Sequence, residues 1–153
     1  PWPFADNCAD EAVLSHVLEH LGQDTKLYLG IIKELYRVCA PDALVRIAVP
    51  HPRHDHFLGD PTHVRAITPG LLELFSRREN LRWQAMKAAN SPLALYHGVD
   101  FELVEAKHVL DEPYATDLRE GRIAQSDIEG LLRRYNNVAQ ETRITLRVVK
   151  PNS

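Results

Sequence analysis

Several features that mark specialised proteins are missing from this sequence of 153 residues. Its two cysteines, Cys8 and Cys39, form no C-x-x-C motif and no disulfide framework, so we expect free thiols in a reducing cytoplasm. No apolar run approaches the roughly 20 residues that span a bilayer, and no signal peptide is visible, so we expect no membrane partner. The seven glycines stand apart from one another and form no G-x-G motif.

The charged residues are mixed rather than clustered. The chain has 18 Lys and Arg against 21 Asp and Glu, with a formal net charge of −3, and the basic residues are scattered among the acidic ones. We therefore expect no nucleic-acid partner, because such a partner requires concentrated positive charge. An apolar content of 44% and a charged content of 25% are typical of a globular protein, and the length fits a single domain, residues 1–153.

The first four residues, Pro1 to Phe4, are apolar and rich in proline, and the chain does not begin with Met. Such a segment is typical of a loop that packs inside a larger structure. We therefore expect a fragment, a processed product or a misassigned start.

The chain is organised around residues 10–21, D-E-A-V-L-S-H-V-L-E-H-L. The nearly continuous apolar character of residues 12–17 predicts a strand that is covered on both faces of a sheet. Polar side chains, among them Ser15 and His16, lie toward the carboxyl end of this strand. In open α/β sheets this end of a strand is where ligands bind.

A helix and a second strand follow. Asp24 or Thr25 can cap a helix that runs to about residue 38, and its apolar residues recur at helical spacing: Leu27, Ile31, Leu35 and Val38. Pro41 and Asp42 break the chain before a strand at residues 43–49. Strand, helix and strand at this spacing predict a right-handed βαβ unit with parallel strands.

The second half predicts two further strands and two helices. The strands are residues 101–110 and 142–149, the latter with Ile144, Leu146 and Val148 on one face. Thr68 and Pro69 begin one helix, and a capping box at residues 126–129 opens another that ends at residues 136–137. Residues 50–67 and 113–121 are predicted to be loops, and residues 77–98 an extended excursion.

Three segments together resemble a known family. They are P-F-A-D-N-x-x-D-E at residues 3–11, S-H-V-L-E-H-L at residues 15–21, and K-E-L-Y-R-V at residues 33–38 with the strand after it. This combination resembles the C-terminal two-thirds of a class I S-adenosylmethionine-dependent methyltransferase of the small-molecule type. The resemblance implies an α/β chain with a partial Rossmann-like methyltransferase fold, a mixed sheet of about four strands and flanking helices.

The sequence departs from the family where the cofactor is usually held. The glycine-rich turn after the first strand and the acidic residue after the second have no counterpart here. The resemblance therefore implies that roughly 60 residues, about two N-terminal βα units, are lacking. The strand at residues 12–17 would then have an unpaired apolar edge, and we expect a homo-oligomer that covers it.

The resemblance implies direct methyl transfer from S-adenosylmethionine to an unknown small molecule, with weak or no cofactor binding by this chain alone. The implied cofactor-binding residues are Phe4, Asp6, Asn7, Ser15 and His16. The expected catalytic residues are His16 and His63, and the expected substrate-binding residues are His20, Asp60 and Arg65. Each has a simpler interpretation as a packed, turn or surface residue.

The histidines of the loop at residues 50–67 allow another interpretation. His51, His54, His56 and His63, with Asp60, supply side chains that bind zinc or nickel. Their spacing matches no ligand pattern, so we predict no metal site and expect this loop to face solvent or substrate. A metal-binding protein and a non-catalytic homodimer remain the two alternative functions.

Overall fold

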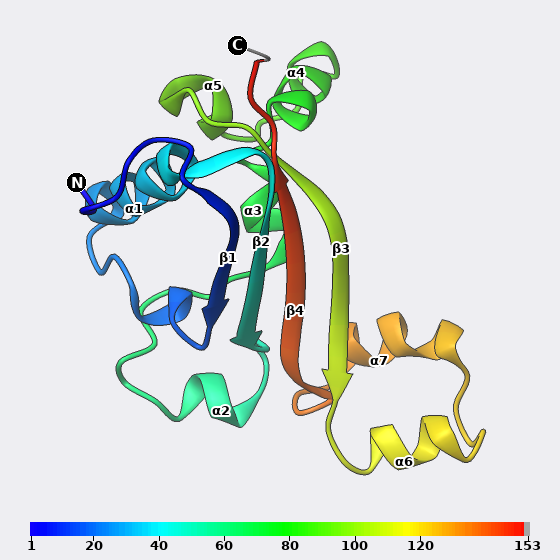
Figure 1. Ribbon diagram of the computed structural model, residues 1–153. Helices are drawn as coiled ribbons and strands as arrows, with labels where there is room; N and C mark the ends of the chain where they lie inside the picture. Colours follow the sequence, from blue (N-terminus) through cyan, green and yellow to red (C-terminus); the bar gives the residue numbers. More distant parts are fainter. Residues whose placement is uncertain (152–153) are drawn as a thin grey trace.

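The computed structural model describes residues 1–151 and contains one mixed sheet with the strand order β1-β2-β4-β3. The strands are β1 (Ala9–Ser15), β2 (Cys39–Pro50), β3 (Phe101–Leu110) and β4 (Ala139–Val148). β1 runs parallel to β2, and β4 runs antiparallel to both β2 and β3 (Figure 1). The predicted α/β fold with a mixed sheet of four strands is confirmed.

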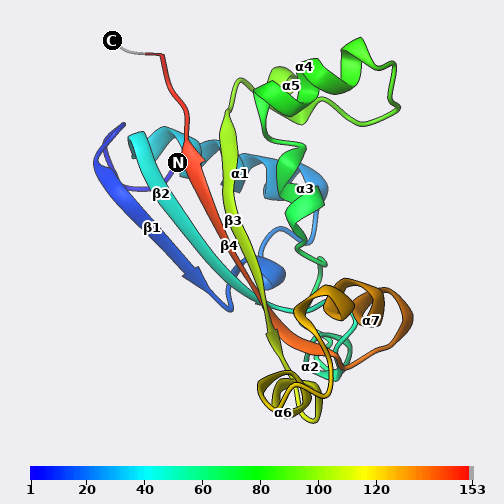
Figure 2. The ribbon, with the colours of Figure 1, turned by 90° about the vertical axis from the view of Figure 1, so that its right-hand side faces the viewer.

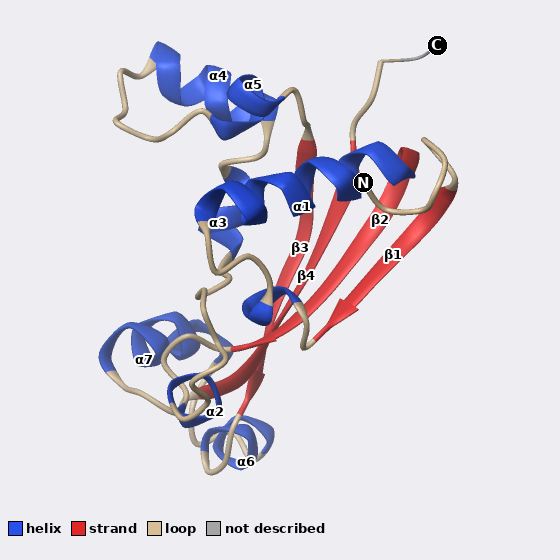
Figure 3. Cartoon of the chain, turned by 90° about the vertical axis from the view of Figure 1, so that its left-hand side faces the viewer, coloured by secondary structure: helices blue, strands red, loops and turns tan. Residues whose placement is uncertain are grey.

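The helices lie against one face of this sheet and beyond the ends of its strands (Figures 1 and 2). They are the 3-10 helices η1 (Leu18–His20) and η2 (Gln125–Asp127), and the α-helices α1 (Thr25–Val38), α2 (Asp55–Leu58), α3 (Pro69–Glu73), α4 (Arg77–Ala85), α5 (Leu93–His97), α6 (Tyr114–Arg119) and α7 (Ile128–Arg134). Figures 2 and 3 show α1 and α3 against one sheet face, while no helix within residues 1–151 covers the opposite face. None of these helices is long and apolar enough to cross a membrane.

The core lies between the covered sheet face and α1 with α3. Val45, Ile47 and Val49 of β2 alternate into it, and Ile144 and Leu146 of β4 do the same. The predicted alternation of the last strand is therefore confirmed. Burial of such branched side chains contributes roughly 1.5–3 kcal/mol each.

The start of α1 is as predicted, but its buried face is rotated. The Asp24 carboxylate caps the helix by accepting a hydrogen bond from the Leu27 backbone at 3.1 Å. Tyr28 and Ile32 are the buried residues of the first turns, whereas the Leu27 side chain is 58% exposed. The aromatic ring of Tyr28 packs against that of Phe75, with the ring centroids 6.3 Å apart.

The cover expected on both faces of the first strand is wrong. Val13 is 67% exposed on the open sheet face, while Leu14 faces the core. The strand begins at Ala9, three residues before the predicted start, because Ala9 and Glu11 already pair with β2. The Glu11 carboxylate binds Arg46 of β2. The strand ends at Ser15 because His16 has a φ of +52°, in the left-handed region.

β1 is an edge strand, as expected. It pairs with β2 on one side, and within residues 1–151 no strand pairs with its other side. The register irregularity between Ala9 and Glu11 lies opposite residues 39–44 of β2.

Several predicted boundaries differ from those observed. β2 begins at Cys39 and includes Pro41, where the missing backbone N–H costs little because ladder pairing with β4 begins only at Leu44. Residues 77–98 form α4 and α5 instead of an extended segment, and the two predicted loops contain α2 and α6. β4 begins at Ala139, three residues before the predicted start.

The capping box predicted at residues 126–129 is also wrong. Asp127, one residue after the predicted Ser126, accepts a hydrogen bond from the Ala124 backbone at 2.8 Å. This contact stabilises η2, and α7 follows and ends at Arg134, before Asn136.

Candidate functional site

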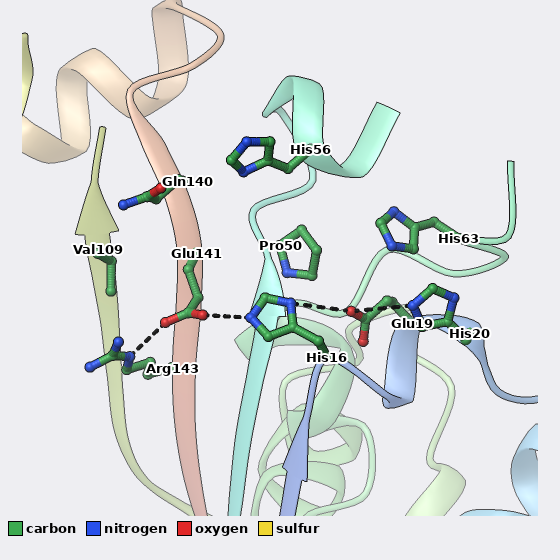
Figure 4. Close-up of a pocket in the computed structure, with 10 residues that line it drawn as sticks. All are labelled: His16, Glu19, His20, Pro50, His56, His63, Val109, Gln140, Glu141 and Arg143. Atoms are coloured by element: carbon green, nitrogen blue, oxygen red, sulfur yellow. Dashed lines mark hydrogen bonds and ion pairs between the residues drawn. The ribbon is translucent and has the colours of Figure 1, made fainter. Parts of the chain in front are cut away.

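A hollow of about 390 Å³ lies at the carboxyl ends of β1 and β2, beside the start of β4 (Figure 4). Its walls come from η1, the segment after β2, and the facing ends of β3 and β4. The lining residues are His16, Glu19, His20, Pro50, His56, His63, Val109, Gln140, Glu141 and Arg143. This is the end of a parallel strand pair at which ligands bind in open α/β sheets.

His16 is held at the tip of β1 by backbone and side-chain contacts. Its backbone N–H donates to the Ala48 carbonyl at 2.8 Å, which carries the parallel pairing one residue past the strand. Its Nε2 lies 2.7 Å from Oε2 of Glu141, and its side chain is 49% exposed. Because a carboxylate only accepts, Nε2–H is the donor, which leaves the Nδ1 lone pair of a neutral ring free.

Glu141 is the anionic partner in this pair. Although partial burial acts to raise its pKa, hydrogen bonds from Arg143 and His16 hold the pKa of Glu141 below its usual value. The Arg143 Nε–H donates to Oε1 of Glu141 at 2.6 Å, so the two carboxylate oxygens have separate donors. Glu141 is therefore ionised near neutral pH and fixes the orientation of the His16 ring.

Glu19 is the buried acid of the site. Its exposed fraction is 0%, and neither carboxylate oxygen has a hydrogen-bond partner. The Glu19 backbone carbonyl accepts from the N–H groups of Val64 and Arg65, at 2.9 and 3.3 Å, which fastens η1 to the segment after β2. Figure 4 shows its carboxylate between the rings of His16 and His20, whose nearest nitrogens lie 3.6 and 3.9 Å from Oε1.

His20 and His63 are oriented by partners behind them. Thr62 Oγ1–H donates to Asp60 at 2.6 Å, so the same oxygen accepts from Nδ1–H of His20 at 3.0 Å. Nδ1–H of His63 donates to the Phe57 carbonyl at 2.9 Å. The hydrogen bonds from Thr62, through its hydroxyl and its backbone N–H, hold the pKa of Asp60 below its usual value.

The predicted site residues therefore fall into separate places. His16, His20 and His63 meet in one hollow, and Asp60 acts through Thr62 behind it. Ser15 lines a neighbouring hollow on the open sheet face.

Phe4, Asp6 and Asn7 precede β1, at the opposite end of the strand from His16. The seven residues of β1 put about 20 Å between the two ends. Arg37 binds Asp6, and Lys150 binds Asn7. The structure thus does not bring these three together with the hollow.

Arg65 holds the fold and does not line the hollow. Its guanidinium donates to the Gly22 carbonyl at 2.9 Å and lies 4.2 Å from the centroid of the Tyr28 ring. These contacts tie the guanidinium to the fold, and the substrate-binding role of Arg65 stays a prediction.

Two of the four loop histidines, His51 and His54, are structural. His54 donates from Nε2 to Asp111 at 2.9 Å, and its Nδ1 accepts from the His56 backbone, so it caps α2. Burial lowers the pKa of His51 to about 4, helped by the nearby charges of His108, Arg53 and His54. His51 is therefore neutral near pH 7.

Three charged residues that line the hollow were not among the predicted site residues. Glu19 follows an apolar pair and precedes a histidine, which is equally typical of a surface turn. Glu141 and Arg143 lie two positions apart at the start of the alternating strand, on the face opposite Thr142 and Ile144. That alternation is the one signal that could have placed the pair on a common face.

No model of a protein family matches the chain, and no curated protein matches it. The fold is, however, similar to solved structures of S-adenosylmethionine-dependent methyltransferases. One from Archaeoglobus fulgidus is 20% identical with a TM-score of 0.52, and the match covers 94% of this chain and 61% of that one. One from Methanosarcina mazei is 16% identical with a TM-score of 0.53, covering 99% and 64%. The chain thus spans about three-fifths of these structures and shares their Rossmann-like α/β fold.

Proposed function

We propose that this chain is part of an S-adenosylmethionine-dependent methyltransferase and that its hollow receives a small-molecule acceptor. The observation that carries the proposal is the pairing of His16 with Glu141 at 2.7 Å on the wall of a polar hollow at the tip of a parallel strand. The similarity in fold to methyltransferases supports the reaction class. The scattered basic residues support a small molecule over a nucleic acid as the acceptor.

His16 is the proposed base. When bound, S-adenosylmethionine supplies an activated methyl group, and a hydroxyl or amine acceptor must lose its proton as it is methylated. The Nδ1 lone pair of His16 is available for that proton, because Nε2–H is committed to Glu141. The resulting imidazolium would lie between the carboxylates of Glu141 and Glu19. Most of the remaining rate enhancement would come from positioning the acceptor.

The described residues do not form a complete cradle for the cofactor. The chain has no G-x-G turn, and Phe4, Asp6 and Asn7 lie a full strand length from the hollow. We therefore propose that the main cofactor contacts lie outside these 153 residues. Titration of the chain with S-adenosylmethionine in a calorimeter should show weak or no binding, with a Kd above about 100 µM.

The activity is tested on the product of the complete reading frame that contains this chain. It is incubated with S-adenosylmethionine and the low-molecular-mass fraction of its own cell extract, and S-adenosylhomocysteine release is measured. His16→Asn should lower the rate by about 100-fold, since a positioned base contributes about 10²–10⁴. His97→Asn, in α5 far from the hollow, is the matched control. Failure of the wild type to release S-adenosylhomocysteine would refute the proposal.

The edge of β1 supports a second candidate function, self-association. The strand has no partner on its outer side within residues 1–151, and Val13 is exposed beside it. Exposed strand edges pair readily with other edges. Sedimentation velocity at high micromolar concentration should detect a dimer that Val13→Lys weakens, and a purely monomeric profile would count against it.

A further inference from the structure

The carboxylate of Glu19 is buried without compensation. Neither oxygen has a hydrogen-bond partner, its exposed fraction is 0%, and among residues 1–151 no lysine or arginine pairs with it. Native structures leave few buried polar groups unpaired, so an orphaned carboxylate calls for an explanation such as an ion. The titratable groups that approach it are the rings of His16 and His20, whose nitrogens lie 3.6 and 3.9 Å from Oε1, beyond hydrogen-bond distance.

The two histidines beside this carboxylate are set to act as ligands. His63 donates Nδ1–H to the Phe57 carbonyl, and His20 donates Nδ1–H to Thr62, whose own proton goes to Asp60. Both rings, when neutral, therefore carry their lone pair on Nε2. A hydrogen bond from the second ring nitrogen to a carbonyl, or to a chain that ends on a carboxylate, is the arrangement that orients histidines bound to metals.

One donor atom from each of Glu19, His20 and His63 lies within 4.8 Å of the other two. Two ligands of one tetrahedral zinc ion lie about 3.4 Å apart, because each lies about 2.1 Å from the ion. The ligand atoms therefore need to move closer by up to about 1.4 Å when an ion binds. Two imidazoles and a carboxylate suit first-row divalent ions, and the adjoining hollow leaves room for further ligands.

We propose that Glu19, His20 and His63 form a binding site for a divalent first-row transition metal such as Zn²⁺. The carboxylate supplies the negative charge, and the two Nε2 atoms complete a three-residue ligand set. Nδ1 of His16, 3.6 Å from Glu19 Oε1, is the next nearest donor. This site uses only one member of the histidine loop, His63, so the loop spacing alone could not predict it. It does not depend on methyl transfer.

The test measures metal binding directly. The purified chain is stripped with a chelator and titrated calorimetrically with ZnCl₂, and with CoCl₂ while the visible absorption is recorded. We expect one ion per chain, a micromolar or tighter Kd for Zn²⁺, and Co²⁺ bands typical of nitrogen and oxygen ligands. No S-adenosylmethionine is present, so the result is independent of the proposed activity.

Variants then assign the ligands. Glu19→Gln keeps the shape and removes the charge, and His63→Gln removes a nitrogen ligand, so each should weaken Zn²⁺ binding by 100-fold or more, on the order of losing a ligand. Thr62→Val, which removes the hydroxyl between His20 and Asp60 and leaves all three ligands in place, should weaken it by about 10-fold. His56→Gln, which lines the same hollow outside the cluster, is the matched control and should bind as the wild type does.

Circular dichroism of each metal-free variant checks that it folds, and Thr62→Val keeps the test decisive if a ligand variant does not. The proposal is overturned if the wild type binds neither ion more tightly than about 1 mM, a level of weak surface association. It is equally overturned if His56→Gln loses affinity while the folded Glu19 or Thr62 variants keep it.

Discussion

Replacing Glu19 by glutamine should stabilise the metal-free protein. Leaving a buried polar group unpaired costs about 1–3 kcal/mol, and more when the group is charged. The amide of Glu19→Gln keeps the volume and removes the charge of a carboxylate that has no hydrogen-bond partner. We therefore expect the free energy of unfolding to rise by about 1–2 kcal/mol, which for a domain of this length raises Tm by about 2–8 °C.

Saturation with Zn²⁺ should make the wild type more stable than Glu19→Gln. At a free zinc concentration of 100 times its Kd, the wild type gains about 2.7 kcal/mol, whereas a variant with a 100-fold weaker site gains about 0.4 kcal/mol. In thermal unfolding followed by circular dichroism, Glu19→Gln should therefore have the higher Tm in chelator, and the wild type should have the higher Tm in ZnCl₂. Glu129→Gln, an exposed surface carboxylate on α7, is the control and should change stability by no more than about 0.5 kcal/mol.

A lower Tm for Glu19→Gln than for the wild type in chelator would contradict this expectation. Such a fall would mean that the carboxylate stabilises the metal-free fold through charged His16 or His20, and that the site needs no ion.

Three further predictions concern the fold around the site. Because the pKa of His51 is lowered to about 4 from its ordinary 6.5, its NMR titration should have a midpoint near 4, and a midpoint above about 6 would contradict the burial. Because the pKa of His51 is lower in the folded state than in the unfolded state, folding stability is lost as pH falls from 6.5 to about 4. His51→Gln should reduce that loss in urea titrations. Gly22→Ala should lower the free energy of unfolding by more than about 3 kcal/mol, because φ is +69° and a Cβ would lie 2.5 Å from the Tyr28 Cα. Gly30→Ala, where a Cβ meets open space in the middle of α1, should raise it by about 0.5–1 kcal/mol in the same urea experiment. Val45→Ala should cost about 2 kcal/mol and Val13→Ala less than about 0.5 kcal/mol by chemical denaturation, and equal losses would mean that the open sheet face is covered.

The alternation of apolar residues made the later strands predictable. Ile144, Leu146 and Val148 follow the period of two, and Phe101 to Leu110 is a strand with the predicted bounds. The first strand was harder, because its exposed valine and its acidic start depend on which face the helices cover. Tertiary packing determines which face is covered, so this cannot be predicted from the local pattern of residues 10–17.

The helices of residues 77–98 were missed for a related reason. Asn80 is fully buried, and its amide accepts from the Ala94 backbone at 3.0 Å and donates to the Leu74 carbonyl at 3.0 Å. A buried polar anchor of this kind joins α4 to its neighbours without an apolar stripe. Hydrophobic periodicity, the main signal for a helix, is weak in such a segment.

The candidate site was predictable only in outline. His16 follows from its position at the end of a parallel strand, as the topology rule suggests. Glu19 does not, because its burial comes from a segment more than forty residues later, and neither Glu141 nor the Thr62 support of His20 can be inferred from the chain locally.

Residues 50–67 are long enough to be a mobile loop, yet contacts at both ends of η1 fix their last part. The Glu19 carbonyl binds the backbone of Val64 and Arg65, and the Arg65 guanidinium then binds Gly22 on the far side of η1. His63 is thus placed relative to His20 by backbone hydrogen bonds, and its ring stacks on Phe57 with centroids 5.3 Å apart. Ligand groups that are fixed before binding lose little conformational freedom when they bind. Backbone hydrogen bonds therefore hold the proposed metal ligands and the wall of the hollow in one frame, and only the side chains of the ligands need to move closer to bind an ion.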